Sequence, residues 1–109
     1  MDFWTNRINN LNNDLNKLKF QPPVDFVYNP LEYAQENYLE YLRKYGQGDK
    51  KAVFLGMNPG PWGMVQTGIP FGEIEIVKEW LKLDKSIQKP LKQHPKRPIM
   101  GLNCRRREI

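Results

Sequence analysis

The stretch GMNPGPWGMVQTGIPFGE, residues 56–73, holds five glycines and three prolines but only one charged residue. A surface loop of this composition is normally polar, because its backbone stays in water and its side chains bury little. Here apolar side chains are spread through the loop instead, at Met57, Trp62, Met64, Ile69 and Phe71. Such a loop is typical of the wall of a small pocket for a flat, apolar ligand.

The segments around this loop predict helices and one strand. Residues 52–57, AVFLGM, form a short apolar run bounded by turn signals, which is typical of a central strand in a covered parallel sheet. Asn29 as N-cap, Pro30 at the first helical position and Gly46 at the end delimit a helix. We predict helices at about residues 6–19, 30–45 and 73–82 and one strand near 52–57. This order indicates an α/β fold whose ligand site lies at the carboxyl end of the strand.

Length and composition limit the class of protein. A chain of 109 residues forms one domain at most. The single cysteine, Cys104, cannot form an internal disulfide, which fits a reducing compartment. No apolar run reaches the length of a signal peptide or a membrane span, so we expect an intracellular, soluble protein.

The basic residues are concentrated in one part of the chain. Residues 1–81 carry a net charge of −2 and residues 82–109 carry +7, which together give the net charge of +5. Basic side chains of this kind could follow a phosphate backbone, and the candidates include Lys92, Lys96, Arg97, Arg105, Arg106 and Arg107. Charge alone favours a solvated tail, so both interpretations stay open at this point.

Three segments together resemble a known family. Residues 53–73, VFLGMNPGPWGMVQTGIPFGE, resemble the first catalytic motif of the single-strand-selective monofunctional uracil-DNA glycosylases. YNPLEYAQENYLEYLRKYG, residues 28–46, is similar to the helix before that motif, and QHPKRPIMGLNC, residues 93–104, to the segment after it. The resemblance implies a helix and Pro-containing linker over 1–23, followed over 24–109 by the amino-terminal part of a glycosylase domain. The fold it implies is a three-layer α/β/α fold with a parallel central sheet, incomplete in this chain.

The resemblance also implies an activity, hydrolysis of the N-glycosidic bond of uracil, and of C5-oxidised uracils, during base-excision repair of DNA. Asn58 would orient the attacking water and Phe71 would stack on the flipped base, while Gly60 leaves room near its C5 edge. Met57 and Met64 would form apolar walls. We expect no cofactor, no metal ion and no membrane, but a nuclear monomer that binds uracil-containing DNA, single- or double-stranded. From the residues alone, Asn58 could equally cap its own turn, and Phe71 and the methionines could be core residues.

Two features of the family have no match in this chain. The family also uses a later Asn for base recognition and a late His motif for the leaving group. The one histidine, His94, aligns with the middle segment and is expected to be exposed in a loop. We therefore expect an amino-terminal part that is inactive alone. Two alternatives remain: a mismatch-specific uracil or thymine glycosylase, which the continuation PWGMVQTGIPFGE argues against, and a non-catalytic nucleic-acid-binding fragment that uses its basic tail.

Overall fold

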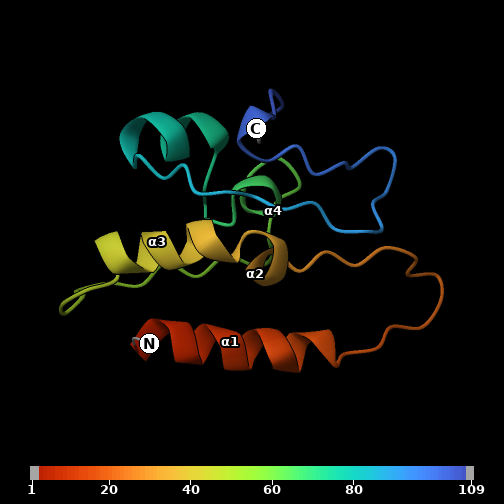
Figure 1. Ribbon diagram of the computed structural model, residues 1–109, viewed down its shortest axis with the longest axis horizontal. Helices are drawn as coiled ribbons and strands as arrows, with labels where there is room; N and C mark the ends of the chain where they lie inside the picture. Colours follow the sequence, from red (N-terminus) through yellow and green to blue (C-terminus); the bar gives the residue numbers. More distant parts are fainter. Residues whose placement is uncertain (1–2, 108–109) are drawn as a thin grey trace.

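The computed structural model describes residues 3–107, which form helices joined by extended segments (Figure 1). The four α-helices are α1 (Phe3–Asn16), α2 (Pro30–Tyr33), α3 (Gln35–Tyr45) and α4 (Met64–Thr67). Two short turns follow, the π-helical η1 (Ile76–Trp80) and the 3-10 turn η2 (Gly101–Asn103). The predicted division into residues 1–23 and 24–109 stays a prediction, and residues 1, 2, 108 and 109 of it lie outside the described residues.

The predicted strand near residues 52–57 is wrong for the described chain, and so is the parallel sheet of the predicted α/β fold. Residues 3–107 contain no β-strand. The backbone of 52–57 makes no hydrogen bond to another described residue, and Val53, Phe54 and Leu55 are 85%, 86% and 94% exposed. A strand needs neighbours that pair with its N–H and C=O groups, and the described residues supply none. The segment therefore has the composition of a central strand without the pairing of one.

Helix α1 lies beside α3, and the two run in opposite directions (Figure 1). Ile8 of α1 packs into a buried cluster with Leu39 and Leu42 of α3. Ile8 is buried, whereas Leu11 of the same helix and Leu18, just beyond its end, are 46% and 57% exposed. The helix also begins and ends earlier than the predicted range of 6–19.

Asparagines join α1 to the start of α2. As predicted, Asn29 is an N-cap, and its side-chain oxygen accepts from the backbone N–H of Leu31 at 3.1 Å. Its Nδ2 donates to the side-chain oxygens of Asn12 at 2.6 Å and Asn16 at 3.0 Å. The asparagines of α1, which weaken the helix by propensity, therefore also attach it to its neighbour.

The predicted helix over 30–45 is divided at Ala34, whose φ of −116° and ψ of 23° lie outside the helical range. Tyr33, Ala34 and Ile99 form a second buried cluster at this point. Burial raises the pKa of Tyr33 well above the ordinary tyrosine value, and nearby Tyr28 adds to the rise. The Tyr33 hydroxyl therefore stays protonated and donates to the carbonyl oxygen of Val65.

A third buried cluster holds the segment after the glycine-rich loop. Its members are Ile69, Val77 and Leu83, and Tyr41 of α3 packs against it. Tyr41 also packs on the first cluster, so one side chain joins both. The predicted helix over 73–82 is shorter than expected, because η1 covers only Ile76–Trp80. The Leu81 N–H bonds to the carbonyl of Ile76 in π geometry, and Trp80 is 76% exposed.

Two fully buried side-chain amides, those of Gln66 and Asn37, connect α4 to other parts of the chain. The Gln66 side chain donates to the carbonyls of Pro61 at 3.1 Å and Pro98 at 2.8 Å, and its oxygen accepts from the N–H groups of Met100 at 2.7 Å and Gly101 at 3.0 Å. Those four bonds use the whole capacity of a side-chain amide. They tie α4 both to the start of its own loop and to residues 98–101.

Asn37 makes the corresponding connection to α3. Its Nδ2 donates to the carbonyl of Thr67 at 2.9 Å, and its Oδ1 accepts from the N–H of Lys85 at 3.0 Å. Among the described residues, no buried side-chain nitrogen or oxygen lacks a partner. No helix within residues 3–107 combines the length and the apolar character needed to span a bilayer.

We predict that Gln66→Ala lowers the free energy of unfolding by about 3 kcal/mol, because it leaves buried backbone donors and acceptors without partners. Asn37→Ala should cost about 2 kcal/mol for the same reason. Urea unfolding followed by circular dichroism measures both. Gln88→Ala is the control, since Gln88 is exposed and bonds only to Ser86 through its side chain. Equal losses for Gln66→Ala and Gln88→Ala would contradict this role.

Candidate functional site

The glycine-rich loop folds around a short turn that its own threonine stabilises. Thr67 Oγ1 donates to the carbonyl of Gly72 at 2.9 Å and accepts from the N–H of Ile69 at 3.2 Å. The Gly72 N–H in turn bonds to the Ile69 carbonyl at 2.8 Å. These bonds close the loop on itself and fix the direction of the residues between them.

Gly68 places this turn directly on α2 and α3. It adopts the left-handed conformation at φ +78°, and a Cβ at this position would lie 2.6 Å from the Cβ of Ala34. Only glycine satisfies both requirements, the positive φ and the close contact. The helix–loop distance therefore depends on this residue.

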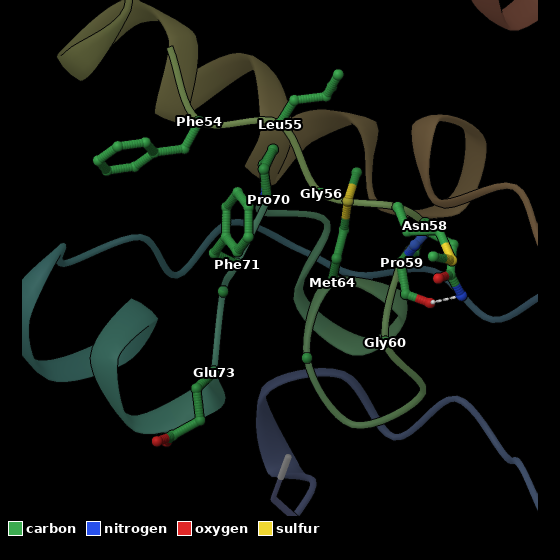
Figure 2. Close-up of a pocket in the computed structure, with 13 residues that line it drawn as sticks. Phe54, Leu55, Gly56, Asn58, Pro59, Gly60, Met64, Pro70, Phe71 and Glu73 are labelled. Carbon is green, nitrogen blue, oxygen red and sulfur yellow. Dashed lines mark hydrogen bonds between the residues drawn. The ribbon is translucent and has the colours of Figure 1, made fainter. Parts of the chain in front are cut away.

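The loop and the segment before it enclose a pocket of about 590 Å³ (Figure 2). All five residues predicted to catalyse or bind the base line this pocket: Met57, Asn58, Gly60, Met64 and Phe71. The structure thus brings together side chains that are up to 14 positions apart in the sequence. Their individual roles stay predictions.

Phe71 presents its ring to the pocket. It lies in the left-handed region at φ 56°, which is uncommon for a bulky residue, and the Thr67 and Gly72 hydrogen bonds hold it there. The side chain is 67% exposed, so Phe71 is not a core residue. Its ring edge lies so near Gly56 that a Cβ there would be 3.2 Å from Phe71 Cζ.

Asn58 is exposed at the mouth of the pocket, where its Nδ2 lies 3.5 Å from the carbonyl oxygen of Pro59 (Figure 2). That distance is at the limit for a hydrogen bond, so the amide keeps its capacity for another partner. Met57 is 98% exposed, and Met64 is half-buried on the facing part of the loop.

The sequence analysis missed the other eight lining residues: Phe54, Leu55, Gly56, Pro59, Gly63, Pro70, Gly72 and Glu73. Phe54, Leu55 and Gly56 were assigned to the strand, and Glu73 to the start of a helix. Glu73 is the one charged residue among the lining residues, and its Oε1 accepts from the N–H of Glu75 at 2.9 Å. An apolar lining with a single carboxylate at its edge suits a flat ligand that carries few charges.

The predicted DNA-binding residues fall into several different environments. The guanidinium groups of Arg97 and Arg106 both lie over the Trp62 ring, at 5.6 Å and 4.5 Å from its centre. Lys92 lies over the ring of Phe26 at 5.1 Å, and Arg107 forms an ion pair with Glu75. The side chains of Lys96 and Arg105 are exposed.

His94 is not in the pocket. The expectation of an exposed histidine is wrong, because His94 is half-buried, its ring packs edge-on against Phe26 and its Nδ1 accepts from the Lys96 N–H at 3.0 Å. Cys104 is free and buried. Within residues 3–107, no three His, Cys, Asp or Glu side chains are grouped so that they could hold a metal ion.

Comparison with known proteins shows which enzymes this chain is similar to in sequence. No protein-family model matches the chain. Over 99 residues, 91% of its length, the chain is 50% identical to a uracil-DNA glycosylase of Rattus norvegicus, 50% to one of Bos taurus and 48% to one of Mus musculus. All three are named single-strand selective monofunctional uracil-DNA glycosylases. The chain is a homologue of the amino-terminal part of these enzymes, and it spans 36% of the length of the curated relatives it matches.

We predict that Gly68→Ala destabilises the protein by about 3 kcal/mol, the sum of left-handed strain and overpacking against Ala34. The matched control is Gly48→Ala, since Gly48 has a similar φ of +75° but no atom within 4 Å of the added Cβ. The control should lose about 1 kcal/mol from strain alone. Urea unfolding followed by tryptophan fluorescence separates the two, and equal losses would show that the contact with Ala34 does not matter.

Proposed function

We propose that this chain is part of a uracil-DNA glycosylase that removes uracil from DNA during base-excision repair in the nucleus. The observation that carries the proposal is the pocket itself, because the five residues of the glycosylase-like motif line one cavity. Similarity to enzymes named as uracil-DNA glycosylases supports the same reaction class.

The pocket suits a flipped base. A glycosylase must take the base out of its stack, which costs a few kcal/mol, and a contact between base and aromatic ring returns about 1–3 kcal/mol. The exposed ring of Phe71 is the group for that contact. Met57 and Met64 supply adaptable apolar walls, and Gly60 carries no side chain that would obstruct the C5 edge, so uracils with small oxidised C5 groups fit the same site.

Asn58 is proposed to hold the water. In the reaction, the water oxygen forms a bond to the sugar carbon while the bond from that carbon to the base nitrogen breaks, and its electron pair leaves with uracil. An amide is too weak a base to take a proton from this water, so Asn58 acts by orienting it. The water's proton passes to solvent or to the uracil anion once the new bond has formed. The exposed position of the Asn58 amide, with only one long contact to Pro59, leaves it available to orient the water.

The leaving uracil anion needs a positive charge or a hydrogen-bond donor of its own, and the only side-chain donor in the described lining is the Asn58 amide that is proposed to hold the water. The lining contains one carboxylate, Glu73, and neither a histidine nor a basic residue. His94, with Nδ1 bonded to Lys96, lies elsewhere. We therefore propose that residues 1–109 need the remaining part of the enzyme for activity.

A second candidate function is nucleic-acid binding without catalysis. The concentration of charge favours it, because residues 82–109 carry +7. Binding of this kind would weaken steeply with salt and show little sequence preference. It differs from the first proposal in requiring neither Asn58 nor Phe71.

We predict that residues 1–109 alone release no measurable uracil from a single-stranded oligonucleotide, whereas a chimera of this chain with the rest of the rat relative does. A missing donor to the leaving group typically lowers the rate by about 10²–10³. Single-turnover release of uracil measures both proteins. Release by the short chain at the rate of the chimera would contradict the proposal that the described pocket is incomplete.

In the same chimera, Asn58→Ala should lower the single-turnover rate by about 10²-fold while DNA binding stays nearly constant, since it removes water orientation. Phe71→Ala should instead weaken capture of the flipped base by about 1–3 kcal/mol. Asn13→Ala and Phe20→Ala are the controls, both exposed and outside the pocket lining. An Asn58→Ala chimera of wild-type rate would refute the role of Asn58.

A further inference from the structure

Two arginines of the carboxyl-terminal segment meet at one aromatic ring of the distant glycine-rich loop, beside the pocket. Arg97 and Arg106 both lie over Trp62, and Trp62 stands between Gly60 and Gly63, which line the pocket. The carboxyl end of the described chain lies close to α4, as Figure 1 shows. Arg97 and Arg106 therefore contact the same loop that carries the proposed base site.

These two charges have no acidic partner in the described part of the chain. Arg97 donates to the carbonyl of Lys96 at 3.0 Å, and neither Arg97 nor Arg106 forms an ion pair within residues 3–107. Arg107, by contrast, is paired with Glu75. Placing two cations near one ring costs repulsion, which the negative face of the indole offsets only in part. An anion between or beside them would remove that cost.

Arg106 also lines a second cleft, which shows where the neighbouring acidic side chains lie. It has a volume of about 430 Å³ and is lined by Arg105, Arg106 and Arg107 together with Lys78, Glu73, Glu75 and Glu79. Glu73 lines both this cleft and the apolar pocket. The three carboxylates balance most of the positive charge there, whereas the Trp62 side of Arg106 carries Arg97 instead of an acidic residue.

We infer that Arg97 and Arg106, held in place by Trp62, bind one backbone phosphate of the DNA strand whose base enters the pocket. Guanidinium groups are suited to phosphate because their N–H donors match its oxygens in pairs. Trp62 is a positioning residue in this site, because both guanidinium groups lie over its ring and are oriented by it. The inference rests on the proposed function only in taking DNA as the ligand.

The test is binding of the 109-residue chain to a labelled, uracil-free single-stranded oligonucleotide, measured by fluorescence anisotropy at several salt concentrations. Arg97→Gln and Arg106→Gln should each weaken binding by about tenfold, as expected for a charged hydrogen bond. The double variant should lose less than the product of the two, because both groups hold the same phosphate, and its salt slope should fall by about 0.7.

Trp62→Leu separates positioning from charge, since it keeps both arginines. It should weaken binding about as much as the double variant, whereas Trp62→Phe, which retains a ring, should stay close to wild type. Arg7→Gln is the matched control for charge and for loss of a cation–ring contact, because Arg7 lies over Phe3 at 4.3 Å on α1. Circular dichroism of each variant monitors folding.

Three results would overturn the inference: wild-type affinity and salt slope in Trp62→Leu, equal losses for Arg105→Gln and Arg106→Gln, or no binding of DNA by the wild-type chain. The first two would assign any binding to diffuse charge in the tail. Because the oligonucleotide contains no uracil, failure here is independent of uracil release. Failure of uracil release in the chimera, with binding as expected, would refute the glycosylase proposal and leave the phosphate site intact.

Discussion

The buried side-chain amide of Gln66 is the contact on which the arrangement of the loop depends. Its four hydrogen bonds join Pro61 and α4, which are neighbours within the loop, to residues 98–101, whose first member lies 32 positions after Gln66. A buried amide with every donor and acceptor used stabilises one arrangement strongly, because any displacement leaves polar groups unpaired. Asn37 extends the same constraint to α3 through Thr67 and Lys85.

The pocket follows from that constraint together with glycine geometry. Gly68 brings the loop against Ala34, and the Thr67 and Gly72 bonds hold Phe71 in a left-handed conformation with its ring exposed. A strained residue persists only where its surroundings determine it, and such residues concentrate at functional sites. The apolar walls of the pocket thus belong to a backbone that hydrogen bonds hold in one conformation.

Exposed apolar residues and basic side chains both lie near the pocket, and they differ in what they bond to. Residues 53–57 present nearly fully exposed apolar side chains and an unpaired backbone next to the lining, so this part of the molecule has unused pairing capacity. Basic side chains, in contrast, take individual positions: Arg107 is neutralised by Glu75, whereas Arg97 and Arg106 share Trp62. The net charge of the tail therefore describes these side chains less well than the partner of each one does.

By itself, the sequence determined the local features: the Asn29 cap and the end of α3 at Gly46. The family motif within it marked five residues that line one pocket, whereas the short helix α4 inside the loop was not predicted. The predicted features depend on near neighbours in the chain, on φ preferences and on a specific motif. It failed for the strand over 52–57, because the composition of a strand records burial and not the presence of pairing partners. The roles of Gln66, Asn37 and the two arginines at Trp62 were decided only by the tertiary structure. Apart from Pro61, which bonds to Gln66, their partners are 30 or more positions away, and no local pattern marks a polar residue that becomes buried or shared.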